Sequence, residues 1–216
     1  MIDTKYPNLN YEYNRITMGD RYICGVDEVG RGAWAGPLSV GAVLIDLTDR
    51  RVLSELVNLG INDSKKLSPK KRLQVFNDFK TRIVSYSIAH LSNKDCEEVG
   101  MSLALKLAAN QAVESLAVAP DHIFVDGPVA FVGKINQTNI VRGDSKSIVI
   151  AAASIAAKVT RDKLMQEYSL KYPEYGFDKN KGYPSKFHIK ALQTIGPCDI
   201  HRTRWKFMQK IYHYEC

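Results

Sequence analysis

Acidic side chains beside glycine recur where apolar stretches of this sequence end. Asp27 and Glu28 end the first of these stretches, Asp126 ends another, and Asp144 follows a glycine after a third. Open α/β sheets collect their ligand sites at the ends of strands, so we expect these side chains to meet in one site. Clustered carboxylates repel one another, and bound cations relieve that repulsion. The pattern therefore predicts a metal centre.

The chemistry of these side chains selects the ion. Carboxylate oxygens suit Mg²⁺ or Mn²⁺, and no His or Cys stands directly beside them, which argues against zinc. A pair of such ions can activate water and stabilise the leaving oxygen in phosphodiester hydrolysis. Taken singly, each Asp before Gly is also a common turn residue at a strand end. Asp27 and Glu28 face opposite sides of a strand unless it ends or bulges there, which Gly30 permits.

A glycine-arginine-glycine segment, Gly30, Arg31 and Gly32, follows the first carboxylate pair. It lacks the lysine and Ser/Thr of a P-loop and the spacing of a dinucleotide fingerprint, so one alternative is a flexible turn. The other is a binding loop, because bare backbone can approach a sugar and its 2′-hydroxyl closely. Tyr183 also has two possible roles: it packs in the interior, or it stacks on a sugar or base among its lysine neighbours.

The basic side chains are expected at the surface. The formal net charge of +7 favours a polyanionic partner such as nucleic acid. We expect seven basic side chains to be solvated and several of them to contact phosphates: Lys65, Lys66, Lys146, Lys158, Arg161, Arg202 and Arg204. Of these, Lys65 is assigned to substrate binding. Ser64 can add a hydroxyl donor, whereas Ser154 is expected to bond its own helix backbone. His188 and His201 are interpreted as structural or surface histidines rather than proton carriers.

The elements that would position these residues alternate between strands and helices. Apolar and β-branched runs predict strands over 21–29, 38–46, 82–91, 122–125 and 139–142. Periodicity and caps predict helices over 49–59, 68–80, 93–116 and 147–168, and a short helix before Gly196. The 93–116 helix is expected to carry Val99, Leu103, Leu107 and Ala108 on one apolar face. The first half of the 147–168 helix is expected to be buried.

Together these elements predict the α/β class, with a mixed β-sheet flanked by helices. The stretch beyond Pro173 is aromatic, basic and rich in turns, so we expect it to form a small separate lobe. At 216 residues the chain fits one domain with such an appendage. No run is apolar enough to cross a bilayer and no export signal is present, so a cytoplasmic protein is expected, with its scattered cysteines reduced.

Several segments, in their order and spacing, closely resemble the ribonuclease HII family. They are GVDEVGRG with AGP at 25–37, DSKKL at 63–67, VDG at 125–127, GDSKS with IAAASIAAKVTRD at 143–162, and KGYPSKFH with GPCDIHR at 181–202. The resemblance implies a ribonuclease H-like fold, with a catalytic domain over 1–172 and a basic C-terminal helical lobe over 173–216 that completes the substrate cleft. Family members usually carry Pro-Leu where this chain has Ala33 and Trp34.

The resemblance also implies a site and a reaction. It assigns metal binding and catalysis, with Mn²⁺ or Mg²⁺, to Asp27, Glu28, Asp126 and Asp144. It assigns ribose sensing to Gly30, Arg31 and Gly32, and recognition of the ribonucleotide junction to Tyr183. The implied activity is hydrolysis of the RNA strand of RNA-DNA hybrids and cleavage 5′ of single ribonucleotides in duplex DNA, leaving 3′-hydroxyl and 5′-phosphate ends. A monomer is expected. The alternatives are another metal nuclease of similar fold, such as a Holliday-junction resolvase or an integrase-like transferase, and a non-catalytic nucleic-acid-binding module.

Overall fold

Five strands of the described residues form one sheet in the order β3-β2-β1-β4-β5. The computed structural model describes residues 6–127 and 135–212. The strands are β1 (Tyr22–Val29), β2 (Leu38–Asp46), β3 (Ser85–Leu91), β4 (His122–Asp126) and β5 (Gln137–Ile140). The first three form an antiparallel meander, and β4 runs parallel to both β1 and β5. The predicted mixed sheet is therefore confirmed.

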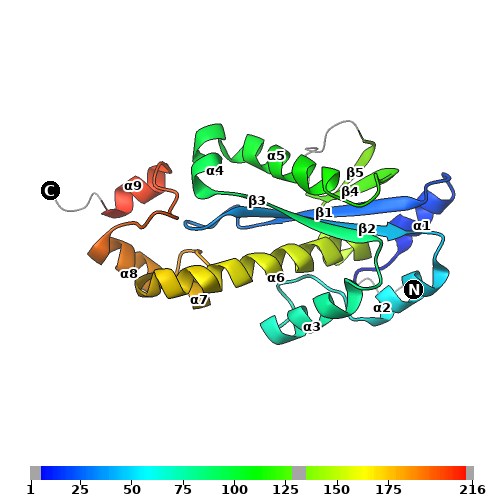
Figure 1. Cartoon of the computed structure of the whole chain (residues 1–216), viewed down its shortest axis with the longest axis horizontal. Helices are drawn as coiled ribbons and strands as arrows, with labels where there is room; N and C mark the ends of the chain where they lie inside the picture. Colours follow the sequence, from blue (N-terminus) through cyan, green and yellow to red (C-terminus); the bar gives the residue numbers. More distant parts are fainter. Residues whose placement is uncertain (1–5, 128–134, 213–216) are drawn as a thin grey trace.

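Helix α6 (Ile148–Lys171) crosses one face of the sheet and packs on β1 and β2 (Figure 1). Two glycines of the sheet allow this contact. A Cβ added at Gly25 would lie 2.3 Å from the carbonyl carbon of Val149, and one at Gly41 would lie 2.6 Å from the carbonyl oxygen of Ala153. Bare backbone at both positions therefore lets the helix approach the sheet closely. The predicted burial of the first half of this helix is confirmed.

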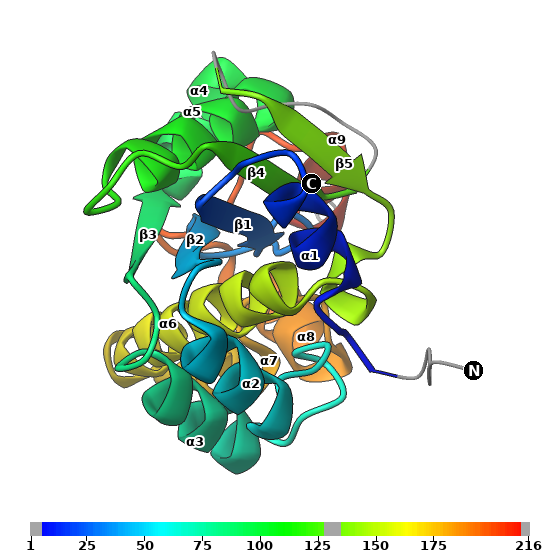
Figure 2. The ribbon, with the colours of Figure 1, turned by 90° about the vertical axis from the view of Figure 1, so that its right-hand side faces the viewer.

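The other helices complete two layers around the sheet. Helices α2 (Arg50–Asn58) and α3 (Pro69–Phe79) lie on the same side as α6, whereas α4 (Asn93–Val99) and α5 (Met101–Glu114) cover the opposite face (Figure 2). One apolar core fills each side. Helix α3 begins where its sequence predicts, because Ser68 accepts the backbone N–H of Lys71 and Pro69 occupies the first turn.

A short helix outside the sequence prediction, α1 (Asn10–Ile16), docks on the first turn of α6. Its Glu12 is buried, and Oε1 accepts hydrogen bonds from Ser147 Oγ at 2.7 Å and from the Val149 N–H at 3.1 Å. Burial raises the pKa of Glu12 to about 7. The polar and aromatic residues of α1 carry no helical periodicity, so tertiary contacts rather than local pattern define this element.

The helix predicted over 93–116 is wrong in two respects. Gly100, with φ 80°, separates α4 from α5. The buried face also differs in part: Ala108 is buried as predicted, but Leu103 and Leu107 are 47% and 46% exposed, and Ala104 is fully buried in their place. Small side chains let α5 pack closely on β2 and β3, and this contact decides the buried face.

The strand predicted over 139–142 ends early, at Ile140. Arg142 takes a left-handed backbone conformation with φ 56°, which extended pairing does not allow. The chain then enters the short 3₁₀ helix η1 (Gly143–Ser145), which carries Asp144. The strand end and the turn together bring Asp144 toward the carboxyl end of the neighbouring β4.

The segment after α6 forms a small helical lobe, as predicted. It contains η2 (Pro173–Tyr175), α7 (Phe177–Asn180), α8 (Lys186–Ile195) and α9 (Lys206–Tyr212). Its apolar core joins Phe177 and Leu192 of the lobe to Met165 of α6 and Ala35 of the loop between β1 and β2. The lobe therefore packs against both the end of α6 and the loop that leaves β1, as Figure 1 shows.

No helix in the described part of the chain combines the length and apolarity needed to cross a bilayer. Cys24, Cys96 and Cys198 are free thiols, as predicted, and Cys216 lies outside the described residues. Burial raises the pKa of all three described thiols, which keeps them protonated and unreactive at neutral pH.

Candidate active site

One pocket, of about 430 Å³, lies where β1 ends. Its lining is Asp27, Glu28, Val29, Gly30, Arg31, Gly32, Ser64, Lys65, Asp126, Asp144, Ser154, Lys158 and Tyr183. Every residue that the sequence assigned to catalysis, metal binding or substrate binding is in this set. The structure thus brings together side chains from β1, β4, η1, α6 and the C-terminal lobe.

Asp27 and Glu28 reach the same pocket although they are neighbours on one strand. β1 stays paired with β2 as far as Val29, without a bulge. On its other side, the pairing of β1 with β4 stops at Val26 and Val125, one residue before Asp27. Because the neighbouring strand ends, the sheet is open beside both carboxylates. β1 itself ends at Val29, one residue after Glu28 and just before Gly30. The end of β4 provides the space into which both carboxylates reach.

Backbone amides fix two of the carboxylates. Asp126 Oδ1 accepts the N–H of Gly143 at 2.6 Å, which ties the end of β4 to the turn that carries Asp144. Asp27 Oδ1 accepts the N–H of Glu28 at 2.8 Å. Hydrogen bonds from backbone amides stabilise the charged form of a carboxylate and orient its second oxygen.

The electrostatics of the cluster favour a bound cation. Asp27 is only 6% exposed, and burial, followed by the charges of Glu28 and Asp126, holds its pKa well above the usual range. Burial is also the main cause that raises the pKa of Glu28 and of Asp144. Positive charge placed among these groups would restore their ionised forms.

The donor set fits a hard divalent ion that is shared with a substrate. All the acidic donors in the pocket are carboxylates, and no His or Cys lines it. Within the described ranges, no three His, Cys, Asp or Glu side chains lie close enough together to hold an ion by themselves. Mg²⁺ commonly uses one or two protein carboxylates and completes its shell with water and phosphate oxygens. The site therefore resembles an open, substrate-completed centre rather than a closed structural one.

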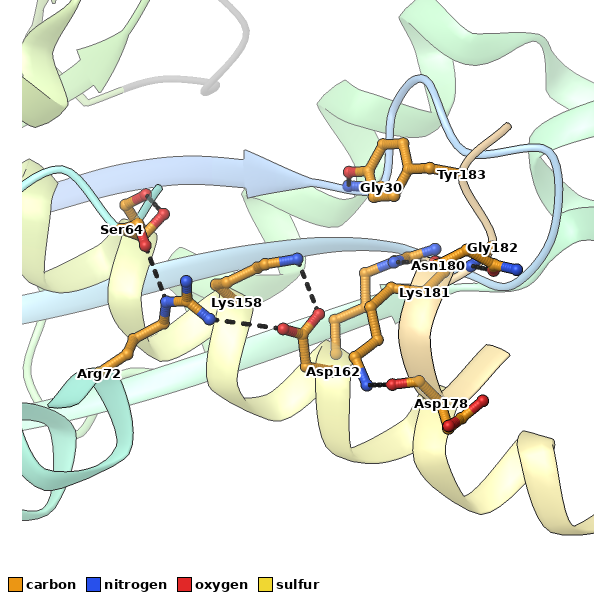
Figure 3. Close-up of polar contacts among 12 residues, drawn as sticks. Gly30, Ser64, Arg72, Lys158, Asp162, Asp178, Asn180, Lys181, Gly182 and Tyr183 are labelled. Atoms are coloured by element: carbon orange, nitrogen blue, oxygen red, sulfur yellow. Dashed lines mark hydrogen bonds and ion pairs between the residues drawn. The ribbon is translucent and has the colours of Figure 1, made fainter. Parts of the chain in front are cut away.

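The glycine-rich loop meets Tyr183 directly (Figure 3). The backbone N–H of Gly30 donates to Tyr183 Oη at 3.0 Å. Gly30 has φ 87°, a conformation that favours glycine. Arg31 lies 3.7 Å from Glu28 Oε1, so the loop also neutralises part of the acidic cluster. Tyr183 is half-buried, and its hydroxyl lines the pocket and bonds the loop, which favours the binding alternative over packing in the interior.

The same loop is tied to the C-terminal lobe by its backbone. Trp34 donates its N–H to the carbonyl of Gly182 at 2.8 Å, and its own carbonyl accepts the N–H of Arg202 at 2.8 Å. Ala33 is buried. The Ala33 and Trp34 pair, where the chain departs from the usual family residues, is thus held by backbone bonds on both sides.

The segment that contains Ser64 and Lys65 is also fixed in place. Ser154 Oγ donates to Ser64 Oγ at 3.0 Å, so the expectation that Ser154 bonds its own helix backbone is wrong. Arg72, which the sequence did not single out, donates to the Ser64 carbonyl at 2.8 Å (Figure 3). Lys65 is exposed beside Asp144, where its charge offsets part of the rise that burial causes in the pKa of that carboxyl. Contacts between segments distant in sequence decide these roles.

For two of the basic side chains, the predicted position at the surface is wrong. Arg161 and Arg202 are both 0% exposed. Arg202 donates to the carbonyl of Arg31 at 2.9 Å and to that of Gly36 at 3.1 Å. A glycine-rich loop leaves carbonyls without strand or helix partners, and the fork of an arginine can satisfy several at once. The interpretation of His188 and His201 as structural is confirmed, because both are buried and bonded to each other.

Known proteins match this chain over most of its length. Residues 24–208 match the family model described as Ribonuclease HII. The chain belongs to the ribonuclease HII family. Ribonuclease HII of Caldicellulosiruptor saccharolyticus is 42% identical to it over 201 residues, which cover 93% of this chain and 94% of that protein.

Solved structures agree with this family assignment. The ribonuclease H2 of Pyrococcus horikoshii has a TM-score of 0.76 at 28% identity, over 89% of this chain and 97% of that one. Ribonuclease HII of Archaeoglobus fulgidus, solved in complex with PCNA, has a TM-score of 0.73 at 25% identity, over 88% and 96%. The protein is therefore a nuclease of ribonuclease H fold whose family acts on RNA-DNA hybrids.

Proposed function

We propose that this ribonuclease HII hydrolyses the RNA strand of RNA-DNA hybrids and cuts on the 5′ side of single ribonucleotides in duplex DNA, leaving 3′-hydroxyl and 5′-phosphate ends. One observation carries the proposal. The carboxylate cluster and the bonded pair Gly30 and Tyr183 line the same pocket, so a scissile phosphate and its neighbouring sugar can be held together.

The proposed metal ligands are Asp27, Glu28, Asp126 and Asp144, with Mg²⁺ or Mn²⁺ as the cofactor. Such ions, when bound in pairs, supply an activated water and stabilise the leaving oxygen. The protein holds the donors in place through the N–H groups of Glu28 and Gly143. The raised pKa values of three of these carboxyls support the proposal, because burial first, and then neighbouring carboxylates, make their charged forms costly unless a cation is bound.

The proposed sugar contacts are Gly30, Arg31, Gly32 and Tyr183. A phenolic oxygen can accept one hydrogen bond and donate another. Since Tyr183 Oη already accepts from Gly30, its own hydrogen is available to donate to a 2′-oxygen. A deoxyribose offers no such acceptor. The tyrosine would thus distinguish ribose from deoxyribose without a change of fold.

Lys65 and Lys158 are proposed to contact phosphates, because both are cationic side chains that line the pocket beside the carboxylates. We also propose that residues 1–172 act as the catalytic domain and that the basic lobe over 173–216 completes the cleft for the duplex. Tyr183 supports this division, since the lobe contributes it to the pocket. The proposal has the protein working as a monomer in the cytoplasm with nucleic acid as its partner.

The decisive experiment compares wild type with Asp126→Asn on a DNA duplex that contains one ribonucleotide. Wild type should cut 5′ of the ribonucleotide in Mg²⁺ or Mn²⁺, and Asp126→Asn should lose at least about 100-fold in rate. Asp121→Asn is the matched control, because Asp121 lies before β4, at the end of the strand opposite Asp126, and bonds the backbone of Arg21 and Tyr22.

Two further substrates separate the alternatives. An all-deoxy duplex of the same sequence and a branched DNA junction should both remain intact. Cutting of the junction would indicate a resolvase, and cutting of the all-deoxy duplex would remove the sugar-sensing role. A protein that binds every duplex with strong salt dependence but cleaves none would be a binding module. Wild-type rates from Asp126→Asn would refute the metal assignment.

A further inference from the structure

Arg161 is a buried cation that bonds only backbone carbonyls. It lies on α6, and its guanidinium donates from Nε to Pro37 at 2.9 Å, from Nη1 to Lys181 at 2.8 Å and from Nη2 to Ala35 at 3.0 Å. Its side chain makes no ion pair with a carboxylate in the ranges that the structure describes. A buried charge is costly without such a partner, so the carbonyls must take its place.

These carbonyls belong to the two segments that carry the proposed sugar contacts. Ala35 and Pro37 lie in the loop that continues from the glycine-arginine-glycine segment, and Lys181 begins the turn that presents Tyr183 (Figure 3). The two segments are far apart in sequence and come from different parts of the fold. Arg161 therefore bonds both of them from a third element.

Arg161 also touches both members of the bonded pair itself. A Cβ added at Gly30 would lie 2.3 Å from Arg161 Nε, so the backbone of Gly30 rests directly on the guanidinium. On the other side, the guanidinium carbon lies 5.5 Å from the centre of the Tyr183 ring. Movement of this side chain would therefore change the position of donor and acceptor in the Gly30–Tyr183 bond together.

We propose that Arg161 is the positioning residue of the ribose check: it fixes Gly30 and Tyr183 at the distance at which the Tyr183 hydroxyl can test for a 2′-oxygen. Arg161 touches no substrate and acts through Tyr183. The inference rests on the proposed function. A lysine cannot replace it, because one ammonium group cannot reproduce three N–H directions in a plane.

The test is a double-mutant cycle between Arg161→Lys and Tyr183→Phe on the duplex with one ribonucleotide. Arg161→Lys should lower kcat at least about tenfold, because small misplacements of a positioning group are costly. Its KM should stay within about twofold, since the basic phosphate contacts are unchanged. In the Tyr183→Phe background, where no hydroxyl remains to be positioned, the same substitution should lower kcat by less than about threefold.

Two controls separate positioning from stability. Val75→Ala removes buried volume in α3, away from the loop, and should leave kcat unchanged at a similar loss of thermal stability. Arg161→Gln is made in parallel and should show the same dependence on Tyr183, so that one well-folded variant suffices.

Each outcome decides one question. A wild-type protein that cuts no ribonucleotide-containing duplex would refute the proposed function and, with it, this inference. Wild-type activity combined with an equal loss from Arg161→Lys in both backgrounds would overturn the role of Arg161 alone, because a purely structural residue acts independently of the Tyr183 hydroxyl. A loss confined to the background with Tyr183 supports the positioning role.

Discussion

His188 and His201 meet edge to edge inside the C-terminal lobe, with their Nε2 atoms 2.9 Å apart. Nδ1 of His188 lies 3.0 Å from the Tyr183 carbonyl oxygen, which can only accept, so this nitrogen carries a hydrogen. Nδ1 of His201 accepts the Cys198 N–H at 2.9 Å, so the hydrogen of that ring is on Nε2 and is donated to Nε2 of His188. Both rings are therefore neutral, and they link the backbone of Tyr183 to the loop at Cys198.

This pair predicts a loss of stability in mild acid. Burial lowers the pKa of both histidines, that of His201 from 6.5 to about 4. The unfolded chain then binds more protons than the folded one between these values, so stability falls as pH decreases from 6.5 toward 4. At 1.36 kcal/mol per unit, His201 alone contributes roughly 3 kcal/mol. Thermal unfolding measured from pH 7.5 to 4.5 should show this slope, and His201→Gln should flatten it. An unchanged slope in the variant would contradict the tautomer assignment.

Glu12 predicts a pH dependence of the opposite sign. The pKa of Glu12 is about 7 in the folded state and 4.5 in the unfolded state. Its contribution to stability is therefore fully present below pH 4.5 and is lost as the pH rises through 7. Glu12→Gln keeps an oxygen acceptor for Ser147 and Val149 but cannot ionise. The variant should gain up to about 3 kcal/mol relative to wild type between pH 5 and pH 8. Urea unfolding at both pH values measures this, with Glu114→Gln on the exposed face of α5 as the control for lost charge.

Tyr183→Phe should weaken cleavage beside a single ribonucleotide without disturbing the fold. The change leaves the Gly30 N–H without its acceptor and removes the hydroxyl that faces the pocket. An unmet hydrogen bond of this kind costs about 1–3 kcal/mol, which corresponds to roughly five- to 150-fold in kcat/KM. Steady-state kinetics test the prediction, with Tyr86→Phe on β3 as a matched control. Equal activity of the two variants would remove Tyr183 from sugar recognition.

Divalent cations should stabilise the folded protein even without substrate. Binding to the carboxylate cluster at ten to 100 times the dissociation constant would add about 1.4–2.7 kcal/mol, or a shift of a few degrees in the unfolding midpoint. Asp27→Asn should abolish most of that shift and should itself be more stable in chelator, because it removes a buried charge repelled by Glu28 and Asp126. Differential scanning fluorimetry with and without Mg²⁺ or Mn²⁺ decides between these outcomes. A shift of the same size in Asp27→Asn would place the cations elsewhere.

The sequence predicts the acidic cluster well because its signals are local. Asp27 and Asp126 each follow a short apolar run beside glycine, and the ends of neighbouring strands must lie close together in a sheet. The glycine-rich loop is predictable for the same reason. Which side chains support these residues is a different matter. Arg161 was expected in solvent because charge alone favours exposure, and only the fold brings Pro37 and Lys181 to it.

The buried face of α5 shows the same limit in the core. Large apolar residues at 103 and 107 suggest the packed side of the helix, but the buried residues are Ala108, which belongs to the predicted face, and Ala104, which does not. Hydrophobic periodicity measures the size and polarity of side chains, whereas close packing selects for shape. For a helix that approaches a sheet through small residues, hydrophobic periodicity alone will therefore predict the wrong buried face.

The close contact between α6 and the sheet at Gly25 and Gly41 changes how mutational data on this enzyme should be interpreted. Neither residue has a functional group, yet an added methyl at either would collide with the backbone of α6. A saturation scan scored only by cleavage would therefore rank Gly25 with Asp27, two positions further along the same strand. Abundance measured in parallel would separate them, since Gly25 variants should disappear from the cell whereas Asp27 variants should persist as inactive protein. Intolerance to substitution alone is thus no guide to chemistry in this fold.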